Sequence, residues 1–233
     1  MTPRPHTMSA EQKVKPVLDA LAAEYGVPER PEREPLEVLV KGILSQNTSD
    51  TNSDRAYGEL RRRYPTWGEM ARADESAIAD AIRSGGLANQ KAAAIGAVLR
   101  WGDGDPEEAV ERLRSAGPEQ AEKELTSIKG VGIKTARLVL LFGFGWPVFV
   151  VDTHVHRVSG RLGLIGPDTG RKKAHRVLDG LVPKGRHYEA HINLIRHGRE
   201  CCSARNPDCP ECCILRWCPA GVERTGRTAA QNG

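Results

Sequence analysis

The chain has 233 residues and contains 34 Lys and Arg against 30 Asp and Glu. It has no run of about 18 apolar residues, which excludes a membrane-spanning helix. Residues 1–128 hold 17 basic and 22 acidic side chains, a net −5, whereas residues 129–233 hold 17 and 8, a net +9, and the two sum to +4. This asymmetry favours a polyanion as the partner of the C-terminal half, with a solvated basic surface as the simpler alternative.

The N-terminal part of the chain predicts a tail followed by two helices of different character. Residues 1–10 are expected to be a disordered tail with no secretory signal. Apolar residues at helical spacing predict an amphipathic helix over 13–25. A linker rich in Pro, Arg and Glu spans 28–35, and an almost wholly apolar helix follows over 36–44. We expect this second helix to lie at the centre of a core.

The rest of the chain keeps helical periodicity. The run 148–151 is the only segment that resembles a strand, and it is too short and isolated to form a sheet. The fold class is therefore predicted to be all-α. The further predicted helices are 54–64, 74–83, 89–101, 107–113, 118–125, 133–142, 152–162, 169–181 and 187–198.

Two short segments interrupt this pattern. The polar run 45–50 contains Gln46 and Asn47, and its simplest interpretation is that its side chains cap successive helices. Leu87 follows two glycines directly before a helix. Taken alone, this leucine would be expected to fold back onto the core.

The most informative stretch is 125–158. One helix ends near Ile128, the turn Lys129-Gly130-Val131-Gly132 follows, and a second helix begins at about 133. The two glycines permit backbone angles that other residues avoid, which predicts a sharp turn between helices. The free N–H groups of the second helix suit a phosphate. Lys134 lies in the first turn of that helix, and Asp152 follows 18 residues later.

These residues form an ordered set of motifs, which are Gly130-Val131-Gly132, Lys134-Thr135-Ala136, Phe144-Gly145-Trp146-Pro147 and Val151-Asp152-Thr153-His154. The set resembles the helix-hairpin-helix and Gly/Pro-Asp element of the endonuclease III superfamily of DNA glycosylases, and the resemblance spans about 10–220. It implies a six-helix barrel over 36–148 that contains the hairpin at about 125–142. A second lobe would combine 11–35 with 149–220, with a DNA-binding groove between the lobes and a disordered tail over 221–233.

The resemblance also implies contacts with DNA. Leu87 corresponds to the family's apolar wedge, which holds a base step open. Pairing with the family pattern places Asn47, rather than Gln46, where an amide fills the space left by an extruded base, so that both residues stay candidates. The remaining implied DNA contacts are Lys129, Gly130, Val131, Gly132, Thr135, His154 and Arg205.

All six cysteines lie between Cys201 and Cys218. Such a cluster in a cytosolic chain is typical of metal binding rather than of disulfides. The spacing of Cys202, Cys209, Cys212 and Cys218 matches the family's iron–sulfur loop, which implies a [4Fe–4S] cluster. Zinc is the alternative for four thiolates. Cys201 and Cys213 are then surplus, and the histidines at 156, 175, 187, 191 and 197 show no metal-binding spacing.

The resemblance gives chemical roles to Lys134 and Asp152. Lys134 would attack C1′ of the deoxyribose as a neutral amine and form a Schiff base. Because a lysine pKa is ordinarily about 10.4, burial or the helix terminus must lower it. Asp152 would stabilise positive charge on the sugar. The simpler interpretations are a phosphate contact for Lys134 and a helix N-cap for Asp152.

The function implied is a bifunctional DNA glycosylase and AP lyase of base excision repair. It would excise oxidised pyrimidines from double-stranded DNA and cut 3′ to the abasic site by β-elimination. We expect a monomer in the cytoplasm, at the nucleoid, with no nucleotide cofactor. Two alternatives stay open, which are a mismatch or other damaged-base glycosylase of the same superfamily and a non-catalytic helix-hairpin-helix module that binds DNA.

Overall fold

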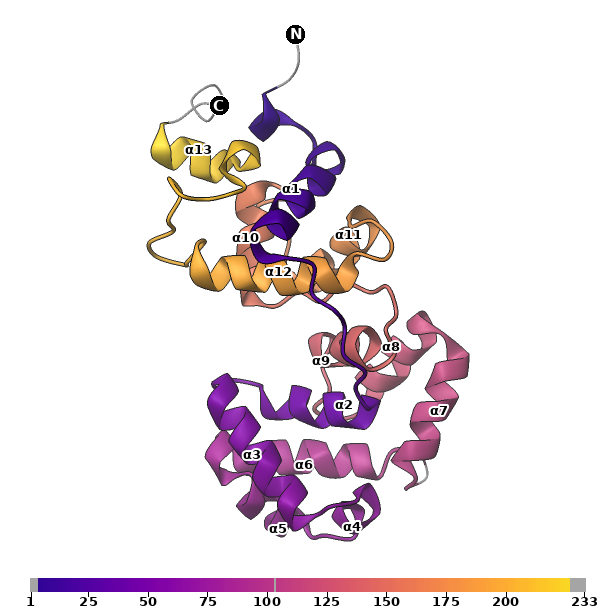
Figure 1. Cartoon of the computed structure of the whole chain (residues 1–233). Helices are drawn as coiled ribbons and strands as arrows, with labels where there is room; N and C mark the ends of the chain where they lie inside the picture. The colour runs from indigo at the N-terminus through magenta and orange to yellow at the C-terminus, as the bar shows by residue number, and fades with distance from the viewer. Residues whose placement is uncertain (1–3, 103, 227–233) are drawn as a thin grey trace. The chain divides into compact units, whose positions relative to one another are not determined.

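The structure is a computed structural model that describes residues 4–102 and 104–226. The described residues form helices and connecting loops without a strand, so the all-α prediction is confirmed (Figure 1). The chain divides into two compact units. One unit is Pro31–Trp146, and the other combines the residues up to Arg30 with those from Pro147 onward. No described helix has both the length and the apolar character needed to cross a membrane.

The unit Pro31–Trp146 is built around α2 (Pro35–Leu44), the predicted apolar helix. Leu39, Val40, Ile43 and Leu44 on this helix are fully buried, because α2 packs against helices on several sides. Its neighbours include α3 (Asp50–Arg63), α6 (Ala88–Leu99), α7 (Pro106–Ala116) and α9 (Ile133–Leu138). The other helices are α4 (Trp67–Ala71), α5 (Glu75–Ala81) and α8 (Pro118–Ser127).

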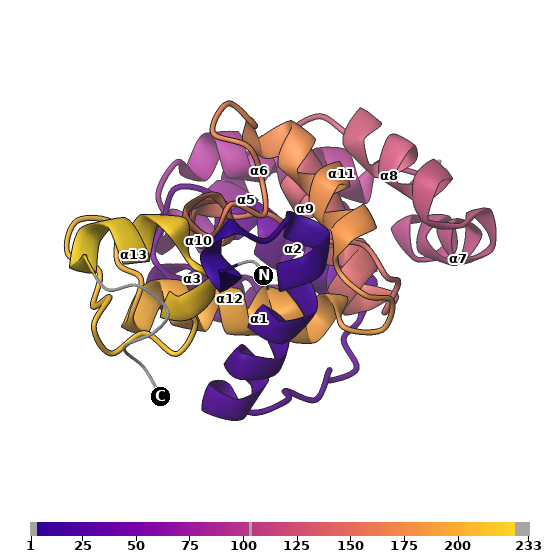
Figure 2. The same ribbon diagram turned by 90° about the horizontal axis from the view of Figure 1, so that it is seen from above.

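The other unit is organised around α12 (His187–Glu200), which packs against α1 (Ala10–Tyr25) and α10 (Thr153–Leu162). The three helices can be followed together in both ribbon views (Figures 1 and 2). The unit also contains α11 (Arg171–Leu181) and α13 (Pro219–Thr225). Its core is apolar and includes the fully buried Phe149.

Several predicted helix boundaries were wrong because short polar caps determine them. The helix predicted over 54–64 begins at Asp50, since the hydroxyl of Ser49 accepts a hydrogen bond from the N–H of Asn52 at 3.3 Å. Helix α4 was not predicted, and a capping box between Thr66 and Glu69 starts it. The helix predicted over 133–142 is present with nearly these bounds, as α9 over Ile133–Leu138 and a directly following π-helical turn over Val139–Gly143.

The prediction of disordered tails was wrong for the described tail residues. Pro5–Thr7 forms a 3₁₀ turn, and the ammonium of Lys13 lies 3.4 Å from the carbonyl of His6. At the other end, α13 continues to Thr225 because the Cys218 side chain caps it, with Pro219 at the first helical position. The rest of the predicted tails, residues 1–3 and 227–233, lies outside the described residues.

Candidate functional site

The predicted hairpin is present between α8 and the helix that begins at Ile133. Gly130 has φ 90°, and a Cβ added there would lie 2.4 Å from the Cβ of Ala94 on α6. Only glycine therefore fits this turn without displacing α6. Lys129 is exposed, whereas Val131 is buried and holds the turn against the unit.

Lys134 is the second residue of α9, and its side chain is exposed. The lysine is therefore not buried, and it lies at the N-terminus of this helix. The next residue, Thr135, was expected to contact DNA, but its side chain is only 3% exposed. In this unit, Lys134 is thus open to a ligand and Thr135 is part of the packing.

Gln46 and Asn47 differ in their surroundings. The amide nitrogen of Gln46 donates to the carbonyl of Gly130 at 3.3 Å and to the hydroxyl of Thr135 at 3.4 Å, which ties it to the hairpin. Asn47 is exposed and has φ 52°. The Asn47 side chain is therefore exposed, whereas Gln46 supports the hairpin.

Leu87 lies in the loop before α6 with φ 51°, and 53% of its surface is exposed. The simpler expectation, that this leucine folds back onto the core, is therefore wrong. A leucine held in the left-handed region costs about 1–2 kcal/mol, and such strain tends to occur at functional positions. The strain and the exposure together fit a side chain that is presented to a partner.

Lys91, a buried residue beside these two loops, was not among the residues predicted from the sequence. Its side chain is 2% exposed, and its ammonium donates to the carbonyls of Leu44 at 2.7 Å and Gly85 at 2.8 Å. These carbonyls lie just before the Asn47 loop and the Leu87 loop, so that one lysine joins both loops. Burial lowers the pKa of Lys91. Its position inside an apolar helix gave no sign of this role.

Asp152 is the N-cap of α10, because its Oδ1 accepts a hydrogen bond from the N–H of Val155 at 2.7 Å. The simpler interpretation of Asp152 is therefore correct, and it leaves Oδ2 for other chemistry. The Nδ1 atom of His154 lies 3.1 Å from Arg157. Arg157 also donates to the carbonyls of Gly198 at 2.8 Å and Cys202 at 3.0 Å, which links the start of α10 to the cysteine loop.

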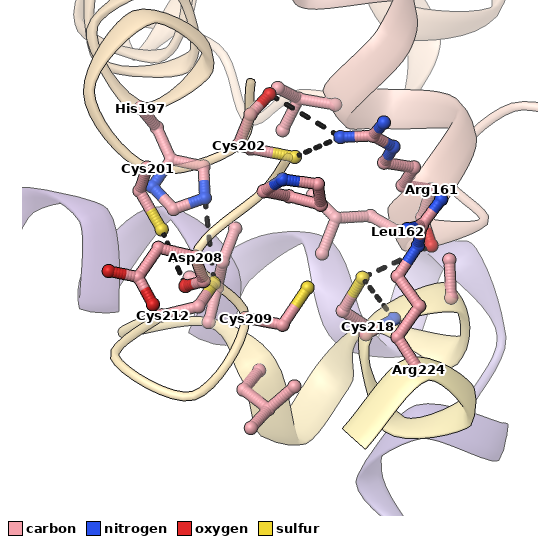
Figure 3. A pocket seen from close by; sticks show the side chains of 16 residues that line it. Arg161, Leu162, His197, Cys201, Cys202, Asp208, Cys209, Cys212, Cys218 and Arg224 are labelled. Atoms are coloured by element: carbon pink, nitrogen blue, oxygen red, sulfur yellow. Dashed lines mark hydrogen bonds between the residues drawn. The ribbon is translucent and has the colours of Figure 1, made fainter. Parts of the chain in front are cut away.

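The four cysteines of the predicted ligand set line one pocket, together with Cys201, Arg161 and His197 (Figure 3). Arg161 donates to the Sγ of Cys202 at 3.1 Å, and the N–H of Gly221 donates to the Sγ of Cys218 at 3.3 Å. A guanidinium and a backbone N–H directed at sulfur suit thiolates. The chemistry of this donor set therefore fits an iron–sulfur cluster.

Two residues that had been set aside also reach this pocket. The donor atoms of His197, Cys201 and Cys212 all lie within 4.8 Å of one another. Nδ1 of His197 is 3.0 Å from the hydroxyl of Tyr25, and its Nε2 is 3.6 Å from the Sγ of Cys212. Burial lowers the pKa of His197 to about 4. Spacing in the sequence could not reveal His197, because α12 brings it to the loop.

Burial also affects the ionisation of the cysteine thiols in this loop. Burial raises the pKa of Cys209, Cys212 and Cys218, and it raises that of Cys213 to about 11. Thiols buried in this way need a positive charge nearby to become thiolates, which a metal would supply.

The loop also contacts Arg161 through its backbone. The carbonyls of Ser203 and Ala204 accept hydrogen bonds from Arg161 at 2.7 and 2.8 Å. The next residue, Arg205, is exposed on the same loop.

Comparison with known proteins gives a consistent result. Residues 40–184 match the family model described as HhH-GPD superfamily base excision DNA repair protein. The endonuclease III of Thermotoga maritima is 35% identical over 201 residues, which cover 86% of this chain and 90% of the relative. The endonuclease III of Synechocystis is 36% identical, with coverage of 80% and 81%.

Solved structures show the same likeness. A non-covalent endonuclease III–DNA complex superposes with a TM-score of 0.77 at 30% identity, covering 94% of this chain and all of the other. A trapped covalent intermediate of endonuclease III with DNA gives the same TM-score at 29% identity. A thermostable thymine-DNA glycosylase, at 22% identity and a TM-score of 0.72, shares the fold.

Proposed function

Because this chain belongs to the endonuclease III family of the HhH-GPD superfamily, we propose that it removes oxidised pyrimidines from damaged duplex DNA. It is a DNA glycosylase and AP lyase of base excision repair, and its partner is double-stranded DNA. The observation that carries the substrate chemistry is Lys134, an exposed lysine at the start of the helix that follows the Gly130-Val131-Gly132 turn. We place its work in the cytoplasm, at the nucleoid.

Lys134 is the nucleophile of the proposed mechanism. Its neutral amine attacks C1′ of the damaged nucleotide as the N-glycosidic bond breaks, and the base leaves with the bonding electrons and gains a proton. The C1′–O4′ bond then breaks as the nitrogen gives up one proton and O4′ gains one, which leaves the opened sugar bound to Lys134 as a Schiff base. Because the iminium draws electrons, a C2′ proton can be removed, and the C3′–O bond breaks by β-elimination. The strand is cut 3′ to the lesion, and hydrolysis of the iminium frees Lys134.

Asp152 supplies negative charge as the base departs. Positive charge develops on the sugar in the transition state, and a fixed carboxylate stabilises it better than mobile water does. The hydrogen bond from Val155 to Oδ1 holds the carboxylate at the helix terminus. Capping and catalysis are therefore compatible, because the cap fixes one oxygen and leaves the other.

Leu87 and Asn47 open the duplex and fill the vacated space. An enzyme that acts on a base must turn the nucleotide out of the stack, at a cost of a few kcal/mol. An exposed leucine can enter the base step, and an exposed asparagine can take the place of the lost base. Lys129 and the backbone N–H groups of the hairpin would contact phosphates, as would Arg205.

The cysteine pocket is consistent with an iron–sulfur cluster, and we propose a [4Fe–4S] cluster on Cys202, Cys209, Cys212 and Cys218. When bound, the cluster would hold the loop 202–218 in shape through four thiolates. Arg161 supports this loop by its hydrogen bonds to Cys202, Ser203 and Ala204. The cluster in this proposal stabilises a basic loop and has no part in breaking the glycosidic bond.

A panel of duplexes tests the substrate assignment. The duplexes would contain thymine glycol, dihydrouracil, uracil, a G·T mismatch or an abasic site, and each would be scored for base release and for strand cutting. We expect release and cutting with the two oxidised or reduced pyrimidines, and cutting without release at the abasic site. Release from the mismatch or uracil duplex alone would instead support the alternative, a mismatch glycosylase.

A further inference from the structure

The segment that leads into Asp152 is buried but forms neither helix nor strand. Phe149 and Val150 are fully buried, and Val148 and Val151 are 8% and 2% exposed. No strand among residues 4–102 and 104–226 lies beside this segment. Backbone N–H and C=O groups that are buried in this way need hydrogen-bond partners. Side chains are among these partners.

Side chains from α11 and α12 supply these hydrogen bonds. The carboxylate of Asp179 accepts from the N–H of Phe149. Nδ1 of His191 lies 3.0 Å from the carbonyl of Val150 and can donate to it. Nδ1 of His175 lies 3.1 Å from the carbonyl of Phe149 and 3.2 Å from the N–H of Val151. Together they replace the neighbouring strand that the segment lacks.

The hydrogen-bonded segment leads directly into Asp152. Its backbone is extended, with φ −99° and ψ −169°, and its Oδ1 is held by the N–H of Val155. The carboxylate is thus fixed by the anchored segment on one side and by α10 on the other. Both histidines are almost completely buried, so water cannot readily replace their hydrogen bonds.

We propose that Asp179 and His191 are positioning residues for the carboxylate of Asp152. The proposal rests on the catalytic role of Asp152 in the proposed function. Neither residue touches the reacting atoms in this account. Each holds the backbone within three residues of Asp152, which determines where the carboxylate lies when charge develops on the sugar. A displacement of about 1 Å can slow an enzymatic step by about 100-fold.

Matched variants separate positioning from general stability. Asp179→Leu and His191→Leu remove the hydrogen-bonding group, whereas Asp179→Asn keeps an acceptor and His191→Asn can place an N–H near the position of Nδ1. Asn193→Leu is the control, because Asn193 is also buried on α12 but donates to the carbonyl of Gly26 at 3.0 Å, away from the segment. Full-length protein with its iron content measured would be used throughout.

The readouts are the single-turnover rate of base release at saturating enzyme and the Kd for a duplex with an uncleavable abasic analogue. We expect the two leucine variants to release base about 10- to 100-fold more slowly with unchanged Kd. The asparagine variants should recover most of the rate. Asn193→Leu should lose stability and keep the rate.

Two results would overturn the proposal. One is a normal rate in folded Asp179→Leu and His191→Leu, and the other is an equal loss in Asn193→Leu. Should a leucine variant not fold, His191→Asn is compared with His191→Gln, whose amide reaches one carbon further, and equal rates overturn the proposal. Asp152→Asn is measured in parallel. Full activity in that variant contradicts the role of Asp152 itself, whereas its inactivity beside a normal Asp179→Leu contradicts only the positioning.

Discussion

Asn47 and Leu87 are the two residues other than glycine that have a positive φ in the described part of the chain, at 52° and 51°. Both are exposed, and Lys91 hydrogen-bonds to the carbonyls of Leu44 and Gly85 just before their two loops. The backbone strain at these residues is not offset by packing of their exposed side chains, and strain of this kind tends to occur at functional positions. We interpret both side chains as the parts that enter the duplex.

The strain at Leu87 predicts opposite effects on stability and on function. Leu87→Gly should leave the free energy of unfolding unchanged or raise it by up to about 1 kcal/mol. Glycine removes the strain of the left-handed conformation, but it also increases the entropy of the unfolded chain, which offsets part of the gain. Excision of a paired lesion should fall more than cutting at an unpaired abasic site, where unstacking costs less. Urea unfolding and the two rates measure this. Equal losses on both substrates, also in Leu87→Ala, would show that the leucine does not open the duplex.

Because Gln46 and Asn47 make different contacts, we expect substitutions at the two positions to have different effects. Gln46→Ala should lower the free energy of unfolding by about 1 kcal/mol, because it removes the hydrogen bonds to Gly130 and Thr135. Asn47→Gly keeps the left-handed backbone and removes the amide, so stability should hold while Kd for lesion-containing duplex rises. The assignment would be reversed if Asn47→Gly bound DNA normally and Gln46→Ala lost only binding.

The parts of this protein that follow from short-range patterns were predicted from the sequence. An almost wholly apolar run identified α2 as the central helix, and the order of glycines, Lys134 and Asp152 located the hairpin motifs. The side chains that hold the neighbouring loops and the segment before Asp152 could not be predicted. Asp179 and His191 contact a segment 30 and 41 residues away, and Lys91 contacts Leu44 across 47 residues. Hydrogen bonds between residues so far apart in the sequence leave no periodic pattern in it.

The cysteine loop shows the same limit. Spacing selected four cysteines and excluded Cys201, yet the fold brings Cys201 into the same pocket and adds His197 from α12. Helix α4 was missed for a different reason. It has only five residues, which are too few to show a periodic apolar pattern. The capping box at Thr66 was the available signal for that helix.

The ligand set predicts which cysteines hold iron. Cys201→Ser and Cys213→Ser should keep iron and the broad yellow-brown absorbance expected of thiolate-ligated iron, whereas Cys209→Ser and Cys212→Ser should lose both. Iron and sulfide analysis of purified protein measures this. Loss of iron in Cys201→Ser with retention in Cys209→Ser would favour the His197, Cys201 and Cys212 group, and one zinc without iron would favour a zinc site.

Burial of His187 predicts a dependence of stability on pH. Burial lowers the pKa of His187 from 6.5, against the opposing effect of the Asp179 carboxylate. The unfolded chain therefore binds more protons as pH falls through about 6.5, so that stability present above this value is lost toward the lower folded pKa. His187→Phe, which can pack beside Phe149, should show a smaller loss between about pH 7.5 and about pH 5 in urea unfolding. An identical loss in both proteins would contradict this.

Covalent trapping with borohydride tests the central claim, that Lys134 is the Schiff-base nucleophile. Wild-type protein should become covalently attached to a duplex that contains thymine glycol or an abasic site, because borohydride reduces the iminium to a stable amine. Lys134→Gln keeps a polar side chain without an amine, so trapping should vanish while the duplex is still bound. Lys129→Gln, at the exposed lysine of the same turn, should still be trapped. Trapping of Lys134→Gln at the wild-type rate would contradict the account, since another amine would then attack the sugar.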